Sequence, residues 1–430
     1  MARKKTRRQF LQQTASAAVG FWVAGQRVLA ESKSPNEKLN IGIIGVAGQG
    51  GYDTDNVVSE EIVALCDVDE KRAGQARERF SKAAFYTDFR KLLDQKGIDA
   101  VVIATPDHTH AVATMAALKA GKHVYCEKPL THSVYETHVV METARKMNRV
   151  TQIGTQTHAS SNYRRVVELI QTKAIGEVQE VHAWVKRSWS GGRRPDDTRP
   201  IPEGLHYDLW LGPAPYRPYH PAYLPAKWRG WWDFGGGTLA DMGCHYLDLA
   251  HWALKLDQPV SIEAEGPPVD PESCPPWLIV RYEYPKRDLL PPVKLTWYHG
   301  GQRPPHFAEN KLPEWKGDGV LFVGTQGMML ADYGHYVLLP QAQYADFKPP
   351  DPFIPESVGH HKEWIEACKT GGRPLCNFDY AAALTKTVLL GNIAYRSGRK
   401  IQWDAARLDI PNAPEAMKFI RPPYREGWTL

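Results

Sequence analysis

Short apolar runs without Asp, Glu, Lys or Arg recur over residues 38–157 of the chain. Runs of this kind are typical of strands buried on both faces of a sheet. They are residues 39–45, 62–65, 100–104, 123–126 and 150–153. Helical spacing separates them, for example at 69–80 and 133–147. This alternation predicts an α/β domain with a doubly wound parallel sheet.

Residues 158–430 follow another pattern, which predicts a second, α+β domain. Its first elements are a helix at 163–173, a strand at 178–186, a Pro-, Trp- and Gly-rich loop at 189–237 and a helix at 239–254. The strand-like runs that follow are 277–284, 293–298, 320–323 and 328–331. These runs predict a large, mostly antiparallel, open sheet. Residues 357–396 return to helical spacing, with Ser357 as the expected cap, and are expected to pack back toward the first domain.

The first thirty residues carry six basic residues and no acidic one. Arg7 and Arg8 stand just before Phe10 and a mildly apolar stretch. The pattern predicts a twin-arginine signal peptide over residues 1–30, a linker at 31–37, and export to the periplasm or another extracytoplasmic compartment. An uncleaved basic amphipathic helix is the alternative.

The formal net charge of +5 falls to −1 when the six basic residues of this segment are subtracted. A near-neutral chain without a Lys/Arg run lacks the cluster of positive charge that binds nucleic acid or an anionic membrane surface. No segment has the ~18 consecutive apolar residues that a membrane span needs. The six cysteines are scattered without a C-x-x-C pair, so the spacing indicates neither a zinc site nor a disulfide framework.

A glycine turn follows the first predicted strand and is the candidate cofactor site. Its residues are Gly45, Val46, Ala47, Gly48, Gln49 and Gly50. Glycines here let main-chain N–H groups approach a pyrophosphate at a helix N-terminus. The match to G-x-G-x-x-G is imperfect because Ala47 replaces the middle glycine, and an ordinary turn is the alternative.

Asp67 ends the second predicted strand, seventeen residues after Gly50. An acidic side chain near this point accepts hydrogen bonds from the adenosine ribose of a dinucleotide. It also repels a 2′-phosphate, so NAD is favoured over NADP. The alternative is a turn residue at a strand end.

Three motifs carry a family resemblance: Thr105–His110 (TPDHTH), Gly121–Pro129 (GKHVYCEKP) and Gly235–His245 (GGGTLADMGCH). In this order and spacing the chain resembles the Gfo/Idh/MocA family of nicotinamide-dependent sugar and polyol oxidoreductases. The resemblance implies an N-terminal Rossmann domain that binds NAD and a C-terminal substrate and oligomerisation domain. It also implies a homo-oligomer, a dimer or tetramer, paired through the C-terminal sheet.

Further cofactor residues follow from this resemblance. They are Thr105, Pro106, His110, Glu127 and Lys128. The resemblance places Pro106 and His110 beside the riboses, and Lys128 near the nicotinamide. For Pro106 and His110 a purely structural turn is the alternative.

Lys128, Asp241 and His245 are the candidate catalytic residues. Oxidation of a secondary alcohol needs a base within reach of the hydroxyl proton and a nearby cation to stabilise developing alkoxide. Asp241 and His245 are spaced i, i+4, so on a helix the carboxylate can orient the imidazole. Whether Lys128 or His245 carries the proton stays open. Asp241 and His245 as metal ligands are the alternative, although spacing fixes no third ligand, and no metal is predicted.

The substrate side is expected to hold indole rings that stack on a sugar and polar groups that bind its hydroxyls. The candidates are Trp184, Arg187, Trp228, Trp231, Trp232 and His245. Core packing is the alternative for the tryptophans.

These features predict an NAD-dependent oxidoreductase acting on the CH–OH group of a carbohydrate or polyol. An NAD-dependent glycosidase, or an enzyme that processes 3-keto sugars, is the main alternative. Such an enzyme oxidises, eliminates, hydrates and re-reduces, so an exported protein would need no external NAD supply. A non-catalytic sugar-binding protein is the third hypothesis, and the presence of Lys128, Asp241 and His245 weighs against it.

Overall fold

The computed structural model describes residues 37–309 and 312–430. The predicted signal peptide, and the linker except for Glu37, lie outside the described residues. The first domain is built on a six-stranded parallel sheet in the order β3-β2-β1-β4-β5-β6. Its strands are β1 (Asn40–Ile44), β2 (Glu61–Cys66), β3 (Ala84–Tyr86), β4 (Ala100–Ile103), β5 (His123–Cys126) and β6 (Thr151–Ile153). The predicted doubly wound sheet is confirmed.

Helices connect these strands and cover both faces of the sheet. They are α2 (Gln49–Val57), α3 (Glu70–Arg79), α4 (Phe89–Leu93), α5 (Asp107–Lys119) and α6 (Val134–Met147). Local sequence sets their ends. The Asp69 side chain caps α3, and Ser133 and Glu136 form a reciprocal capping box at the start of α6.

The second domain contains an eight-stranded sheet in the order β13-β12-β11-β7-β10-β9-β8-β14. Its strands are β7 (Val178–Val185), β8 (Ser261–Glu265), β9 (Leu278–Tyr284), β10 (Val293–His299), β11 (Gly319–Gly324), β12 (Met328–Ala331), β13 (Tyr336–Leu339) and β14 (Ile401–Gln402). Among these described strands β7 and β10 pair in parallel, and the other pairs are antiparallel. The predicted mostly antiparallel sheet is confirmed.

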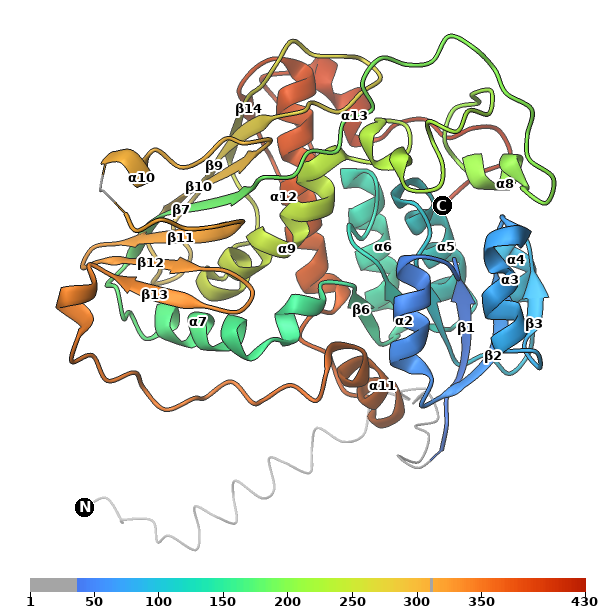
Figure 1. Cartoon of the computed structure of the whole chain (residues 1–430), viewed down its shortest axis with the longest axis horizontal. Helices are drawn as coiled ribbons and strands as arrows, with labels where there is room; N and C mark the ends of the chain where they lie inside the picture. Colours follow the sequence, from blue (N-terminus) through green and yellow to red (C-terminus); the bar gives the residue numbers. More distant parts are fainter. Residues whose placement is uncertain (1–36, 310–311) are drawn as a thin grey trace, which may run out of the picture.

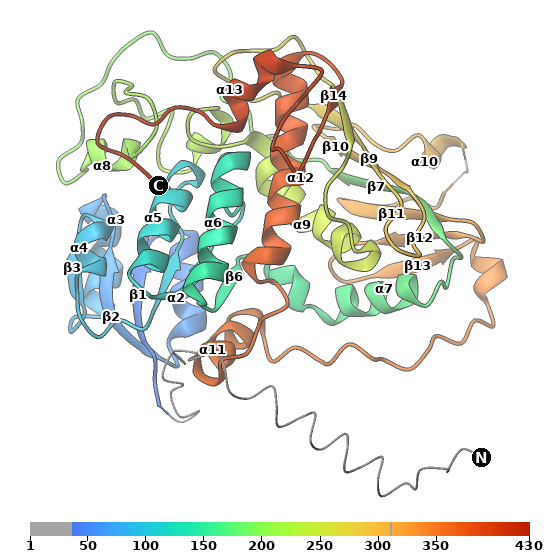
Figure 2. The ribbon, with the colours of Figure 1, turned by 180° about the vertical axis from the view of Figure 1, so that it is seen from behind.

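Long helices cover one face of this sheet and enclose the larger core, while a smaller cluster that includes Trp184 lies on the other face. The helices of the domain are α7 (Ser161–Gln171), α8 (Tyr207–Leu211), α9 (Gly237–Leu254), α10 (His306–Glu309), α11 (His360–Thr370), α12 (Phe378–Ser397) and α13 (Met417–Ile420). Short 3-10 turns are Gln156–Ala159, Lys227–Gly230, Gln341–Tyr344 and Pro414–Ala416. Figure 2 shows α12 passing between α6 and α9.

The stretch 357–396 forms two helices. α11 packs on α2, and α12 packs on α6 and β6, so both contact the first domain (Figure 1). Ser357 is not the cap of α11. Its hydroxyl oxygen accepts a hydrogen bond from the N–H of Gly359. Gly359 is the N-cap residue, and its φ of +111° directs the chain into the helix.

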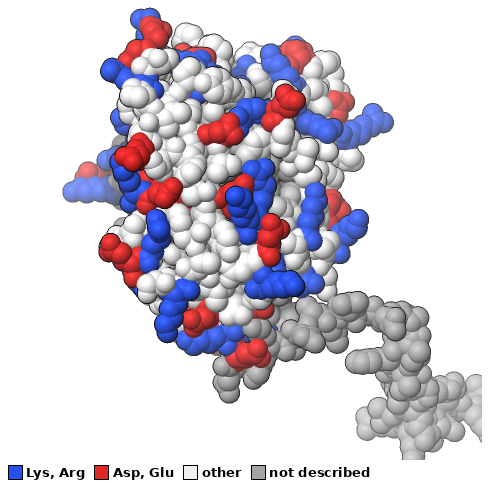
Figure 3. Space-filling view, turned by 90° about the vertical axis from the view of Figure 1, so that its right-hand side faces the viewer, with Lys and Arg blue, Asp and Glu red and all other residues white. Residues whose placement is uncertain are grey.

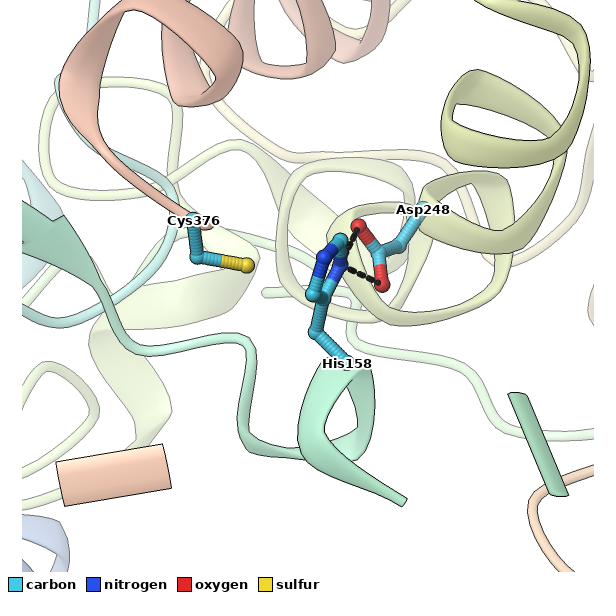
Figure 4. A group of neighbouring side chains, drawn as sticks. All are labelled: His158, Asp248 and Cys376. Carbon is cyan, nitrogen blue, oxygen red and sulfur yellow. Dashed lines mark hydrogen bonds and ion pairs between the residues drawn. The ribbon is translucent and has the colours of Figure 1, made fainter. Parts of the chain in front are cut away.

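A buried polar group joins the end of the first domain to α9 and α12 (Figure 4). The ring Nδ1 of His158 lies 3.1 Å from both carboxylate oxygens of Asp248, and the Tyr380 hydroxyl donates to the same carboxylate. His158, Asp248 and the neighbouring Cys376 are each at most 1% exposed. Since a buried carboxylate must be hydrogen-bonded, this group constrains how the two domains sit together.

Among the described residues no helix is both long and apolar enough to cross a membrane. The six cysteines are all free and buried. Lys and Arg side chains are interspersed with Asp and Glu over the face shown in Figure 3. That face therefore carries no large patch of one sign.

Candidate functional site

A cleft opens between the domains at the carboxyl ends of β1, β2, β4 and β5. The predicted site residues that line it are Gly45, Ala47, Gly48, Gln49, Asp67, Thr105, Pro106, His110, Glu127, Lys128, Trp228 and His245. Asp241 lies directly behind this lining and contacts Lys128. Residues from the C-terminal tail also reach the cleft, including Trp428. The fold thus brings together residues that are far apart in the sequence.

The glycine turn has the shape that a dinucleotide pyrophosphate requires. Gly45 has φ +84°, and a Cβ there would lie 2.7 Å from the carbonyl oxygen of Ala104. A Cβ on Gly50 would lie 1.8 Å from the carbonyl oxygen of Gly45, so no larger residue fits without moving the turn. Gly48 begins α2 without a side-chain cap, which leaves the first N–H groups of the helix for an anion.

Asp67 supports this turn from the end of β2. Its Oδ2 accepts from the N–H of Val46 at 3.1 Å, and its Oδ1 accepts from the N–H of Asp69 at 3.0 Å. Burial raises the pKa of the carboxyl above its ordinary value, although both hydrogen bonds favour the charged form. Asp67 therefore has a structural role in the turn while its side chain also lines the cleft.

Lys128 and His245 both line the cleft, and Asp241 pairs with Lys128. The Lys128 ammonium donates to Asp241 Oδ1, and the Arg229 Nε lies 3.5 Å from the same oxygen. Asp241 makes no hydrogen bond to His245 among the described residues, although its negative charge favours the protonated imidazole. Two cations occupy the carboxylate, and the ring Nδ1 of His245 is buried without a hydrogen-bond partner among the described residues.

The pKa values of this group are shifted from those of the free side chains, and each shift reinforces the charge state at neutral pH. Burial and then the Lys128 charge lower the pKa of His245 to about 3, so the imidazole is neutral at neutral pH. Burial opposes the charge on Lys128, but the Asp241 carboxylate outweighs burial and raises the pKa of the ammonium. Burial likewise opposes the charge on Asp241, and Lys128 and Arg229 hold its pKa below the usual range. The site therefore holds a stable cation beside a neutral imidazole.

The metal alternative for Asp241 and His245 does not fit this geometry. An ammonium and a guanidinium already neutralise the carboxylate, and a cation added there would meet both of them.

Glu127 lies beneath the cleft in a hydrogen-bonded group. Its Oε1 accepts from Gln156 Nε2 at 2.6 Å and from Gln49 Nε2 at 3.3 Å, and Gln49 Nε2 also donates to Asp53. Burial raises the pKa of Glu127 to about 8 and that of Asp53 to about 7. His361 Nε2 lies 3.1 Å from Asp53 Oδ1, which ties α11 to this group.

His110 is engaged on both ring nitrogens. Nδ1 lies 2.7 Å from the carbonyl oxygen of Pro129, and Nε2 lies 2.8 Å from that of Thr105. The ring thus links the loops after β4 and β5, and its structural role is clear. Thr105 Oγ1 in turn accepts from Thr109 at 2.8 Å.

Four residues of the site were not predicted from the sequence: Asp53, Asp107, Gln156 and Arg229. Asp107 is 3% exposed, and burial raises the pKa of its carboxyl to about 8. It belongs to the TPDHTH motif, so its place directly after a strand end was a usable signal. Arg229 follows Trp228 in the 3-10 turn Lys227–Gly230, and nothing in the local pattern marks it as a partner of Asp241.

The tryptophans are mostly structural, which corrects the substrate-side expectation. Trp184 is fully buried on the outer face of the C-terminal sheet, and its Nε1 donates to Gly317. Trp231 and Trp232 are about 5% exposed, with Nε1 donating to Ala222 and Asp270. A large apolar ring is favoured in a core when its one polar atom is hydrogen-bonded, so these side chains pack in cores and do not face a substrate.

Trp228 and Arg187 remain candidates for substrate contact. Trp228 lines the cleft, with the Arg229 guanidinium 4.2 Å from its ring centre. The Arg187 side chain is more than half exposed, 3.9 Å from Asp318.

Residues 39–155 match the family model "Oxidoreductase family, NAD-binding Rossmann fold", and residues 172–288 match "Oxidoreductase family, C-terminal alpha/beta domain". Together they cover more than half of the chain. The chain belongs to the Gfo/Idh/MocA oxidoreductase family. Its first domain is the NAD-binding domain of that family, in agreement with the glycine turn described above.

Two curated relatives of this family member are informative. The chain is 32% identical over 157 residues to inositol 2-dehydrogenase of Rubrobacter xylanophilus, covering 35% of this chain and 45% of that protein. It is 26% identical over 197 residues to levoglucosan dehydrogenase of Pseudarthrobacter phenanthrenivorans, covering 44% and 42%. The matched segment spans less than half the length of these relatives.

Solved structures share the fold over nearly their whole length. The WlbA dehydrogenase of Bordetella pertussis, in complex with NADH and UDP-GlcNAcA, matches with a TM-score of 0.61 at 16% identity, covering 86% of this chain and 99% of that one. An NAD-binding protein from Listeria innocua matches with a TM-score of 0.59 at 18% identity, covering 85% and 97%.

Proposed function

We propose that this protein transfers hydride between a secondary hydroxyl of a sugar or polyol and NAD. The observation that carries the proposal is the convergence of Lys128, Asp241 and His245 on a cleft that also contains the glycine turn. NAD, when bound, supplies the hydride acceptor, and Gly45, Gly48 and Asp67 are the residues that would hold it. The names of the inositol and levoglucosan dehydrogenases support the substrate class.

The protonation states of His245 and Lys128 assign a role to each residue of the proposed catalytic pair. The neutral imidazole of His245 can take up the hydroxyl proton, because burial keeps its nitrogen lone pair available at neutral pH. The Lys128 ammonium, held by Asp241, stabilises negative charge that develops on the substrate oxygen. His245 is therefore the proposed base, and Lys128 the proposed electrostatic stabiliser.

Asp107 supports a second candidate, the NAD-dependent glycosidase. Because burial raises its pKa to about 8, Asp107 is a protonated carboxyl in the lining of the cleft at neutral pH. An elimination step needs such a proton donor for the leaving oxygen. Lys128 and His245 would perform the oxidation and the return of hydride in either case.

One experiment separates the two candidates. Purified protein is incubated with polyols, free sugars and aryl glycosides, with and without added NAD. A dehydrogenase accumulates NADH in proportion to substrate when NAD is added. A glycosidase releases the aglycone without added NAD and with no net NADH, and Asp107→Asn lowers that release. Inactivity toward every compound by a protein that also fails to bind NAD would contradict both proposals.

We also propose that the protein is exported by the twin-arginine route and assembles as a homo-oligomer. The paired Arg7 and Arg8 support export, and the family membership supports assembly. Replacing both arginines by lysine should block export of a tagged chain. Sedimentation of the purified protein should give a mass of two or four chains, and a monomer would contradict the assembly proposal.

A further inference from the structure

Three metal-ligating side chains gather on the outer face of the C-terminal sheet, apart from the cleft. Glu180 and His182 are two residues apart on β7, so both point to the same face, the one that also carries Trp184. The short helix α10 lies beside this face and brings His306 to it (Figure 1). None of the three lines the cleft described above.

The distances between them suit one small cation. Glu180 Oε2 lies 3.5 Å from His182 Nε2 and 4.0 Å from His306 Nε2, and the two imidazole rings are 4.4 Å apart between centres. Bonds of about 2.0–2.2 Å to a tetrahedral zinc place neighbouring ligand atoms roughly 3.3–3.6 Å apart. Each distance to Glu180 is within a few tenths of an ångström of that range, so a small movement would close the site.

The hydrogen bonding of His182 is incomplete at the nitrogen that faces Glu180. Its Nε2 is buried, lies 3.5 Å from Glu180 Oε2, and has no hydrogen-bond partner among the described residues. The other nitrogen of His182, Nδ1, lies 3.0 Å from the Tyr298 hydroxyl on the neighbouring strand β10. A second hydrogen bond of this kind is what fixes the ring orientation and tautomer of a metal-bound histidine.

The donor atoms also favour a metal. The Glu180 side chain, 40% exposed, supplies a negative charge and leaves one side of the group open to solvent. Two imidazoles with one carboxylate favour zinc and similar transition metals over magnesium or calcium.

The buried group of His158, Asp248 and Cys376 differs on these points (Figure 4). There the imidazole and the carboxylate already bond each other, Tyr380 donates to the carboxylate, and Cys376 contacts the Thr155 hydroxyl at 3.2 Å. His158 Nε2 also has no hydrogen-bond partner among the described residues, but this group has no solvent side from which an ion could enter. The group on β7 and α10 has an open side, and its imidazole nitrogens lie 3.5 Å or more from its carboxylate.

We propose that Glu180, His182 and His306 form a site for a divalent transition metal of the zinc class, with a fourth position open to solvent. The ion would fasten α10 to the sheet, and it would take no part in chemistry at the cleft. This site is independent of the proposed hydride transfer, so either proposal can fail without the other.

The test measures metal binding by the full-length protein. After treatment with EDTA and its removal, we expect one Zn²⁺ per chain in equilibrium dialysis, and Co²⁺ in its place should give the intense visible absorption of tetrahedral coordination. His182→Gln and His306→Gln should each weaken Zn²⁺ binding at least about 100-fold, and Tyr298→Phe roughly tenfold. The control His335→Gln, an exposed histidine on another turn, should bind like wild type.

The variants also identify other outcomes. If wild type binds no Zn²⁺ after dialysis, the proposal is wrong. It is also wrong if both His182→Gln and His306→Gln retain one tight Zn²⁺, because the ion then lies elsewhere. Circular dichroism and NAD binding, which do not depend on this face, report whether each variant is folded. If His182→Gln proves unfolded, His306→Gln decides, since His306 stands on a short surface helix.

Discussion

At the scale of single residues, the cleft holds a positive charge on Lys128 and a proton acceptor on His245. Lys128 keeps its proton because Asp241 holds it, and His245 remains neutral because burial and Lys128 disfavour a second cation. Neither pKa shift follows from the residue types alone. Both arise because one carboxylate faces two cations while the imidazole is left without a hydrogen-bond partner on Nδ1.

Lys128→Met and His245→Ala should each lower turnover by a factor of about 10² or more, the usual scale for acid–base groups. NAD affinity should change little, because the glycine turn and Asp67 are separate from both side chains. Steady-state kinetics and fluorescence titration with NADH check the two parts. Full activity in both variants would place the chemistry elsewhere.

The pH dependence of kcat/KM should reflect the environment of His245. Since burial and then Lys128 lower the pKa of His245 to about 3, the imidazole stays an acceptor well below its ordinary pKa of 6.5. We expect no loss of kcat/KM centred near pH 6.5 on the acid side. An acid limb near pH 6.5 that disappears in His245→Gln would show that the ring titrates normally and that the assigned role is wrong.

At the scale of elements, the turn between β1 and α2 depends on close contact between backbone atoms. Gly50 packs on the carbonyl oxygen of Gly45, and Asp67 holds the N–H of Val46 from the next strand. A side chain at Gly50 would therefore displace the turn.

Gly50→Ala should weaken NAD binding at least tenfold, because its Cβ would lie 1.8 Å from the Gly45 carbonyl oxygen and must displace the turn. Gly51→Ala is a matched control in the same helix, since the nearest atom to its Cβ is 3.7 Å away. Calorimetric titration with NAD measures both variants. Equal affinities for the two would mean that the turn is free to adjust.

A second prediction at this scale concerns the contact between α12 and α9. Tyr380→Phe removes a hydrogen bond to the buried Asp248 carboxylate and should lower the free energy of unfolding by about 1.5–3 kcal/mol, the range for bonds to charged groups. Urea unfolding measures it. Tyr216→Phe, at a site 70% exposed, should leave the stability unchanged. A loss of similar size in both variants would contradict the assignment.

At the scale of the whole molecule, burial of titratable groups links stability to pH. Ten histidines of the described residues have pKa values lowered to about 3 or 4, with burial the largest cause. They are His108, His110, His123, His132, His182, His245, His251, His299, His360 and His361. Burial raises the pKa of three carboxyls to about 7 or 8, namely Asp53, Asp107 and Glu127.

These shifts act in opposite directions. Below pH 6.5 the unfolded chain binds protons at histidines that stay neutral when folded, so the free energy of unfolding falls as pH falls. The raised carboxyls keep protons in the folded state up to about pH 7–8, so their contribution falls as pH rises. Ten histidines outweigh three carboxyls on the acid side, and the carboxyls act alone above pH 6.5.

We therefore expect Tm to be highest near pH 6.5 and to fall more steeply toward pH 5 than toward pH 8. Differential scanning fluorimetry across this range measures the profile. His299→Gln, which removes one of the ten groups, should flatten the acid flank. A Tm that rises on acidification from pH 6.5 to pH 5 would contradict this balance.

The periodicity of the sequence predicted five of the six strands of the first domain, because strands buried on both faces leave uninterrupted apolar runs such as 100–104. Strands at or near sheet edges were missed: β3, β8, β13 and β14 are short, or face solvent on one side, and carry little signal. The glycine turn, Lys128 and His245 could be found because backbone geometry and strand-end position restrict residue type locally.

Only the tertiary structure decided which side chains pair with one another. Asp241 pairs with Lys128 and Arg229 because side chains from three distant segments meet there, although helical spacing suggested His245. Trp184, Trp231 and Trp232 are buried in cores because burial of the large apolar indole ring is favourable once its Nε1 is hydrogen-bonded. Each Nε1 donates to a backbone carbonyl oxygen. The sequence by itself determined the class of fold, the NAD-binding turn and the candidate residues of the site. Their charge states depended on desolvation and on neighbours that only the folded chain brings within a few ångströms.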